Sequence, residues 1–358
     1  MGRRTRGELI EEIKNNLARK PLSINELADD KLNSNWSTIR DIIQFMEKLD
    51  LVEAINPQDK LKVYRLTKAI IQKRKDTWFG LPLTEEEEKT IHHLFSRIKQ
   101  LFLEKLNRAP KDTEVQKTAV DVANACNLKI PMGWYLFGLI TVMRYDNKVD
   151  YNSSSIDCPP EKVDQEILMS IENCKKITYV RELAKRQYEI YDKKLYQIKE
   201  ELKKINNQRL DLNDINSRKI LQKLFSSLLF YLPTGDDAKE IIGIATDYVN
   251  VMNQLIISKL DLNELKSDLS DAFDSVWRYI ATYCFFDTVT ETGNYDKKTI
   301  YEIYFKSSME DRKEIAYEHI DYLRELVPKE DEIPVLRLEN DKGDIIRKTY
   351  EEMAMETK

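Results

Sequence analysis

The stretch N-W-S-T-I-R-D-I-I-Q-F-M-E-K-L-D-L-V, which runs from Asn35 to Val52, carries the clearest structural signal in the chain. It opens with side chains that are favourable helix N-caps. Its apolar residues then recur at helical spacing, at Ile39, Ile42, Ile43, Met46 and Leu49. We expect a helix that ends at Leu49 and buries this stripe, which leaves the opposite face outward: Ser37, Arg40, Asp41, Gln44 and Lys48.

Two shorter patterns precede this helix. Residues 8–19 form an amphipathic pattern that ends at Pro21, with one apolar face made of Leu9, Ile10, Ile13 and Leu17. Ser23 then lies three residues before Glu26, which is the signature of a capping box. It predicts a very short second helix through Ala28.

Two alternating segments follow the helix, over residues 51–55 and 61–66, and the turn-prone residues 56–60 join them. Three helices followed by a hairpin of two strands are the parts of a winged helix-turn-helix domain. In such a domain the N-terminal residues of the recognition helix reach base edges, and hydroxyl, amide and Arg side chains suit that role. The basic hairpin and the basic N-terminal arm are placed to contact phosphates or a minor groove.

The candidate DNA-contacting residues are therefore those of the arm, the recognition helix and the hairpin: Arg3, Arg4, Arg6, Ser34, Asn35, Trp36, Ser37, Thr38, Arg40, Gln44, Lys60, Lys62 and Arg65. Two of these assignments have alternatives. Trp36 fits better as a side chain half-buried against the short helix than as a base-stacking one. The arm arginines are equally compatible with a solvated tail.

The N-W-S-T-I-R segment, with L-D-L-V-E after the helix, resembles the archaeal winged helix-turn-helix transcription regulators, which have N-W-x-T before the recognition helix and G-L-V-E after it. The resemblance covers about the first 75 residues. Asp50 stands where that family usually has glycine, and Asp tolerates a left-handed backbone better than most residues. The resemblance implies a cytoplasmic protein that binds double-stranded DNA.

Charge is distributed unevenly along the chain. Residues 1–75 hold 16 Lys and Arg against 11 Asp and Glu, whereas the whole chain has a formal net charge of −5. The first segment is thus basic and the remainder is acidic. A DNA-binding head on an acidic body fits this asymmetry, because only the head has to neutralise phosphates.

Composition predicts a mainly helical remainder, because glycine is scarce, with nine residues, and apolar side chains recur at three and four. We expect three units along the chain. They are a winged helix-turn-helix domain over residues 1–80, a helical unit that links to the body over 81–155, and a helical bundle over 156–358. The last unit would end with a small hairpin over residues 335–346.

One long charged segment of the body has the spacing of three heptads, with apolar residues at Ala184, Tyr188, Tyr191, Leu195, Ile198, Leu202 and Ile205. The expected body is therefore all-helical and includes a long antiparallel or coiled-coil helix. Two interpretations remain open. The helix either forms an intermolecular seam that makes a homodimer or is one arm of a hairpin within the chain.

The most unusual stretch of the body is I-P-M-G-W-Y-L-F-G, residues 130–138. Together with Val115-Gln116-Lys117 it is similar to the Q-K and W-Y-x-Y-G pattern of prokaryotic Panacea-type domains, which are linked to antitoxins and phage defence. The chain departs from that pattern at Gly138-Leu139, where Gly-Pro is usual. Our interpretation of Trp134 to Phe137 is buried core.

The sequence lacks the local motifs of catalysis and metal binding, namely a phosphate loop, G-x-S-x-G, H-E-x-x-H and C-x-x-C. The four cysteines and three histidines have no metal-ligand spacing. We expect neither an enzyme nor a bound cofactor or metal. No signal-peptide core follows the basic start, and the longest apolar run, residues 132–143, is too short to span a bilayer, so we expect a cytoplasmic protein.

The resulting hypothesis is a sequence-specific double-stranded DNA-binding transcription regulator. Its helical body would form a homodimer, sense a small effector or recruit another protein. The alternative is a non-enzymatic scaffold, or an antitoxin or defence-type protein, whose winged helix contacts a protein partner.

Overall fold

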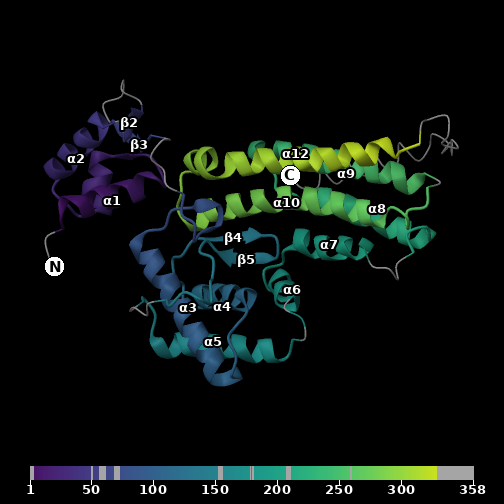
Figure 1. Cartoon of the computed structure of the whole chain (residues 1–358), viewed down its shortest axis with the longest axis horizontal. Coiled ribbons are helices and arrows are strands. Elements are labelled where there is room, and N and C mark those ends of the chain that lie inside the picture. Colours follow the sequence, from purple (N-terminus) through teal and green to yellow (C-terminus); the bar gives the residue numbers. More distant parts are fainter. Residues whose placement is uncertain are drawn as a thin grey trace, which may run out of the picture.

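The computed structural model describes residues 4–49, 51–55, 62–67, 73–151, 156–177, 179, 181–206, 211–258 and 260–328. The described part of the chain is mainly helical, as expected from the sequence, and contains two small antiparallel sheets (Figure 1). None of the described helices combines the length and apolar character that crossing a bilayer requires. The predicted hairpin at residues 335–346 lies outside the described residues.

The N-terminal unit, residues 4–67, is called the head below. Its elements are α1 (Arg6–Leu17), β1 (Leu22–Ser23), the π-helix η1 (Glu26–Lys31), α2 (Trp36–Lys48), β2 (Val52–Ile55) and β3 (Val63–Leu66). The three strands form one antiparallel sheet in the order β1-β3-β2, with Val52 opposite Leu66 and Leu22 opposite Tyr64. The helices and the sheet share a core of their own.

Local caps explain where the helices of the head begin. Thr5 and Glu8 form a reciprocal capping box at the start of α1, and the Asn35 side chain accepts a hydrogen bond from the Ser37 N–H at the start of α2. The expected bond between Ser23 and Glu26 is also present, with 3.2 Å between Glu26 N and Ser23 Oγ. The helix that follows is longer than expected, however, because it continues as a π-helix to Lys31.

The prediction that Leu49 enters the core is wrong, because its side chain is 52% exposed. The other four residues of the predicted stripe on α2 are buried. Leu49 is the C-cap of α2, and the N–H of Leu51 bonds back to the carbonyl of Met46. The helix ends at Leu49, so the helical spacing no longer determines whether this side chain faces the core.

The larger unit, residues 73–328, is called the body. Its helices and strands are α3 (Glu85–Leu106), α4 (Asp112–Ala125), β4 (Met132–Tyr135), β5 (Gly138–Thr141), α5 (Pro160–Lys175), α6 (Arg181–Ile190), α7 (Lys194–Leu202), α8 (Ile215–Phe230), α9 (Lys239–Ile257), α10 (Lys266–Thr292), α11 (Lys297–Ile300) and α12 (Lys306–Glu325). Short 3-10 segments lie at η3 (Trp78–Gly80), η4 (Lys203–Asn206) and η5 (Asp236–Ala238), and a π-helix at η6 (Tyr301–Phe305).

Helix α10 is the centre of the body. Its residues are buried on almost every face, including the run from Tyr279 to Phe286. It packs against α12, α9 and β4, and Figure 1 shows α8, α9, α10 and α12 as one bundle beside a second group made of α3, α4 and α5. One continuous core extends from Leu81 to Leu323 through both groups. The predicted boundary near residue 155 stays a prediction, although buried residues on both of its sides belong to this core.

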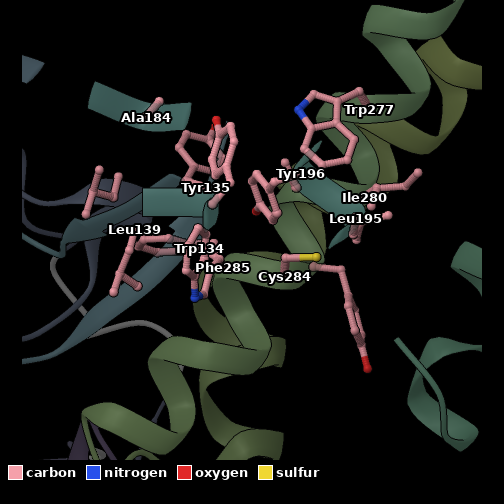
Figure 2. Packing of buried hydrophobic residues seen from close by; sticks show 14 of the residues in the cluster. Trp134, Tyr135, Leu139, Ala184, Leu195, Tyr196, Trp277, Ile280, Cys284 and Phe285 are labelled. Atoms are coloured by element: carbon pink, nitrogen blue, oxygen red, sulfur yellow. The ribbon is translucent and has the colours of Figure 1, made fainter. Parts of the chain in front are cut away.

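The prediction of an all-helical body is wrong at residues 132–141, which form an antiparallel hairpin of β4 and β5. All eight strand residues are buried, so the pattern lacks the alternation of polar and apolar residues that marks a strand. The hairpin lies between the two helix groups, with β4 on α10 and β5 on α4 and α6. Figure 2 shows Trp134 and Tyr135 of this hairpin beside Tyr196 and Phe285. Phe137, expected in the core, is 54% exposed because it lies in the turn.

The prediction of one long heptad helix is also wrong. Helix α6 ends at Ile190 and α7 begins at Lys194, and Asp192 between them has a left-handed backbone with φ 46°. Six of the seven predicted seam residues are buried in the core of the same chain, and Tyr191 is half-buried. The spacing of three and four therefore survives the break, because both helices direct their apolar faces at one core.

Arg19 joins the head to the body. Its guanidinium forms two bonds with the Glu87 carboxylate of α3, of 2.5 and 2.8 Å, and a third with the carbonyl of Gly293. It also lies over the Tyr295 ring, 4.5 Å from the ring centroid. In addition, the Asp296 N–H donates to the Arg19 carbonyl. Because Arg19 is only 8% exposed, this ion pair is largely shielded from water.

Substitution of Gly133 tests how closely the hairpin approaches α10. A Cβ at Gly133 would lie 2.4 Å from the Phe285 ring, whereas a Cβ at Gly243, in the interior of α9, would meet nothing within 4 Å. We expect Gly133→Ala to lower the free energy of unfolding by about 1–3 kcal/mol. Gly243→Ala, the matched control, should raise it by roughly 0.5–1 kcal/mol. Urea denaturation measures both, and equal effects would contradict the close packing.

Removal of Arg19 tests the junction of head and body. Arg19→Ala leaves the Glu87 carboxylate partly buried without its partner, so we expect a loss of about 3 kcal/mol in the free energy of unfolding. Lys14→Ala breaks only an exposed pair with Glu11 and should cost less than about 0.5 kcal/mol. Thermal unfolding of both variants makes the comparison, and a neutral Arg19→Ala would show that the pair contributes no stability.

Candidate nucleic-acid interface

Helix α2 lies at the side of the head that faces away from the body (Figure 1), and within the head it packs against η1 and β2. Its apolar stripe is buried, and the other face of the helix is largely exposed. Ser37, Thr38, Gln44 and, in part, Arg40 are exposed on this helix. The predicted recognition helix is therefore accessible to a large partner.

The N-terminus of α2 is held in a defined conformation. Asn35 Oδ1 accepts hydrogen bonds from the Ser37 backbone N–H, at 2.9 Å, and from its hydroxyl, at 2.7 Å. The Trp36 indole N–H donates to Asn25 Oδ1 at 2.7 Å, although the side chain remains 44% exposed. Asn35, Ser37 and Trp36 are thus engaged within the head, whereas Thr38 and Gln44 present free polar groups among the described residues.

The four predicted arginines among the described residues lie at the surface, and each of these four has a partner. Arg4 pairs with Glu12 at 2.7 Å and donates to Ser34 Oγ at 3.3 Å, which ties the arm to the residues before α2. The other three partners are carboxylates or rings: Arg40 with Asp41 at 3.0 Å, Arg65 with Glu53 at 2.6 Å, and Arg6 over the Phe45 ring at 4.9 Å. Exposed ion pairs contribute little stability, so a phosphate can replace the carboxylate.

The candidate residues fall into two groups. The first group lies before α1, at its start and in or just before α2, and it comprises Arg4, Arg6 and the candidates from Ser34 to Gln44. In the second group, Lys62 is exposed just before β3 and Arg65 lies on β3. Arg3 and Lys60 lie outside the described residues. This surface also has an apolar part that the sequence did not predict, because Phe45 and Leu49, near the end of α2 and away from Trp36 at its start, are 41% and 52% exposed. Phe45 does not belong to the apolar stripe of α2 that faces the core, and its exposure could have been predicted from this position in the sequence.

The cleft between the head and the body has a different character. It measures about 1040 Å³, and carboxylates outnumber basic groups among the side chains that line it. They come from α1, from Asp30 of η1 and from the first turn of α3, whose four residues are Glu85, Glu86, Glu87 and Glu88. Such a lining disfavours a phosphate backbone, so α2 rather than the cleft is the candidate surface for nucleic acid.

A second polar cluster lies inside the body, beneath the turn of the β4–β5 hairpin. Gln116 of α4 donates to the Met143 carbonyl and accepts from the N–H and hydroxyl of Thr141. Its neighbour Lys117 is 2% exposed and donates to the Leu139 carbonyl at 2.9 Å. Through these hydrogen bonds, Gln116 and Lys117 of the Q-K segment hold β5 against α4.

The amines of this cluster are shielded from water. Burial lowers the pKa of Lys117 to about 7, and burial lowers the pKa of Lys199 to about 8, even though Lys199 pairs with Glu200 at 2.6 Å. Both amide atoms of Gln187 and the Tyr188 hydroxyl are buried without a hydrogen-bond partner among the described residues. Gly138, with φ +103°, is required here, because its Cβ would lie 2.8 Å from Lys117 Nζ and from Gln187 Oε1.

The described residues contain no group of three or more His, Cys, Asp or Glu side chains that could hold a metal ion. No protein-family model, no curated protein and no solved structure matches this chain.

The buried Lys117 makes stability depend on pH. Its pKa is lowered from 10.5 to about 7, so the unfolded state binds the proton more tightly than the folded state between these values. Below about pH 7 the ammonium is buried and its full cost is present, and stability increases as pH rises above 7. We expect the free energy of unfolding to increase from pH 6.5 to pH 8.5, measured by urea denaturation.

In Lys117→Met this increase should be much smaller, because the titrating group is gone while a chain of similar length remains. Lys219→Met, at an exposed position of α8, should keep the wild-type slope. A slope unchanged in Lys117→Met would show that the Lys117 amine does not titrate in this range.

Proposed function

We propose that the head is a winged helix-turn-helix that binds double-stranded DNA, and that the chain is a sequence-specific transcription regulator. The observation that carries the proposal is the arrangement of the head. Three helical segments are followed by the hairpin of β2 and β3, β1 joins that hairpin as a third strand, and α2 is directed away from the body. This arrangement supports the proposal, because the recognition helix of a helix-turn-helix domain enters the major groove.

The roles of individual residues follow from their positions. Thr38, Arg40 and Gln44 lie on the free face of α2, where they would reach base edges. Lys62 and Arg65, on the hairpin, would contact phosphates and fix the register. Arg4 would approach the backbone beside the N-terminus of α2, next to Ser34. A single head provides a small footprint, so we expect a homodimer that binds two half-sites.

A second candidate function rests on a specific observation. Trp36, Phe45 and Leu49 are all more than 40% exposed on α2, and aromatic side chains together with Arg are enriched in protein interfaces. The same helix would then bind a protein partner rather than a base sequence, and the chain would be a scaffold.

Fluorescence anisotropy distinguishes the two functions. The full chain is titrated into a labelled duplex of its own upstream intergenic region and into a scrambled duplex, at 50 and 200 mM salt. A regulator should prefer its own region and lose about 100-fold in affinity between the two salt concentrations, as expected for about four phosphate contacts. Binding that is equal for both duplexes, or insensitive to salt, contradicts the regulator.

Charge reversal locates the surface. Arg40→Glu with Lys62→Glu should lower affinity more than tenfold at 50 mM salt, because two predicted contacts become repulsive. Lys219→Glu with Lys223→Glu makes the same charge change on α8 and should leave affinity within threefold. Equal losses in the two double variants would mean that net charge alone, and not this face, governs binding.

A further inference from the structure

Two turns of the body have nearly the same sequence and bind each other. Asp-Leu-Asn-Asp at residues 211–214 precedes α8, and Asp-Leu-Asn-Glu at residues 261–264 precedes α10, 50 positions later. Each asparagine side chain donates to the first aspartate of the other turn and accepts the N–H of its leucine. The four bonds are Asn213 to Asp261 at 2.6 Å, Asn263 to Asp211 at 2.7 Å, Leu212 to Asn263 at 2.9 Å and Leu262 to Asn213 at 3.0 Å. This reciprocal exchange indicates an approximate twofold axis between the two turns.

The helices before the two turns repeat at the same displacement. Helix α7 with η4, and helix α9, bury side chains at four pairs of positions that are 50 residues apart. The pairs are Leu195 and Ala245, Ile198 and Tyr248, Leu202 and Met252, and Ile205 and Leu255. In space α7 contacts α8, α8 contacts α9, α9 contacts α10, and α10 returns to η4. The helical hairpins α7–α8 and α9–α10 therefore form a bundle with approximate twofold symmetry.

Helix α12 breaks this symmetry. It packs along α10 and also against α9 (Figure 1), whereas the extensive contacts of α8 within the described residues are with α7 and α9. The rotation that carries α10 onto α8 and α9 onto α7 would carry α12 to a position along α8. No described helix packs extensively on both α7 and α8. One hairpin is thus covered by a helix, and the equivalent side of the other is open.

The open side of α8 exposes large apolar side chains. Ile220, Lys223, Ser227 and Phe230 follow one another at steps of three, four and three, so they share one face of the helix. Ile220 is 59% and Phe230 is 73% exposed. The exposed ring of Tyr231 extends this face, with its centroid 5.0 Å from that of Phe230. Apolar side chains gathered in this way mark an interaction surface, whereas single ones do not.

The same face is basic, although the body as a whole is acidic. Helix α8 has no acidic residue and three basic ones, Arg218, Lys219 and Lys223. Arg218 is used within the fold, because its guanidinium donates to three backbone carbonyls at and after the end of α9. Lys219 and Lys223 are exposed, and neither forms an ion pair with another residue that the structure describes. Their charges are therefore available to a partner.

We propose that this face of α8 binds an amphipathic helix of a partner protein, with apolar side chains directed at Ile220 and Phe230 and acidic side chains beside Lys219 and Lys223. The symmetry supplies the kind of partner, since the equivalent position on α10 holds the helix α12. The lysines supply its charge. A second copy of α8 fits less well, because it would bring like charges together. The proposal does not depend on the DNA-binding function, which uses the head.

A direct binding experiment uses two labelled helical peptides of 20 residues, the length of α12. One carries leucine on one face and glutamate on the other, and the second has lysine at every glutamate position. In a fluorescence-anisotropy titration with the full-length chain at 50 mM salt, we expect the acidic peptide to bind at least tenfold more tightly. The difference should decrease as salt rises, because the lysines are exposed. Absent binding of the acidic peptide, or equal binding of the two peptides, overturns the proposal.

Surface variants locate the binding face. Ile220→Ser with Phe230→Ser should lower affinity for the acidic peptide at least tenfold, because two apolar contacts are lost. The matched control, Ile315→Ser with Tyr322→Ser, removes two exposed apolar side chains from α12 and should leave affinity within threefold. Lys219→Glu with Lys223→Glu should also lose the peptide. Equal losses in the Ile220 and Ile315 double variants would show that the peptide binds elsewhere.

Two measurements on the wild-type chain complete the test. A carbodiimide condenses a carboxylate with an adjacent amine and releases water, so it should link glutamates of the bound peptide to Lys219 or Lys223, which mass spectrometry identifies. Links confined to lysines of other helices contradict the proposal. Sedimentation of the chain alone reveals whether a second copy takes this place. Self-association that Ile220→Ser with Phe230→Ser abolishes would overturn the assignment to a partner protein.

Discussion

The burial of α10 on almost every face is the constraint on which the rest of the body depends. A helix with apolar side chains all round has to be covered on all sides, and α9, α12 and the β4–β5 hairpin supply this cover. The hairpin approaches closely because Gly133 leaves room for the Phe285 ring. Two helix groups are thereby joined through one short pair of strands, and a single core runs through both of them.

The same hairpin explains why polar groups are buried in the body. Its strands are joined by a two-residue turn, and the carbonyls of Leu136 and Leu139 at and beside that turn need donors, which Lys199 and Lys117 provide. Placing amines there lowers their pKa values towards neutrality, because the ammonium form loses its hydration. The buried amines lower the stability of the fold, but their hydrogen bonds hold the hairpin in one position. Only glycine fits the turn at position 138.

The head is coupled to this core through Arg19, whose bonds to Glu87 and Gly293 and stacking on Tyr295 fix its position. Helix α2 consequently faces away from the body in a fixed orientation, and any partner of α2 meets a surface whose geometry the body has set (Figure 1). That surface is mixed: polar side chains at the N-terminus of α2, paired arginines around it, and the exposed Phe45 and Leu49 beyond. The two proposed functions, a DNA-binding regulator and a scaffold, differ in which of these parts contacts the partner.

Local signals by themselves determined much of this protein. The Asn35 cap, the apolar stripe of α2 and the alternation in β2 and β3 are short-range preferences, and the elements appear where these residues predict them. What only the tertiary structure decided depends on contacts between distant segments. The buried β4–β5 hairpin has no alternating pattern, the break at Asp192 leaves the heptad spacing intact, and the pair Arg19–Glu87 joins residues far apart in sequence. Periodicity reports which face of an element is buried, but it does not report what that face is buried against, and this is the physical reason for the difference.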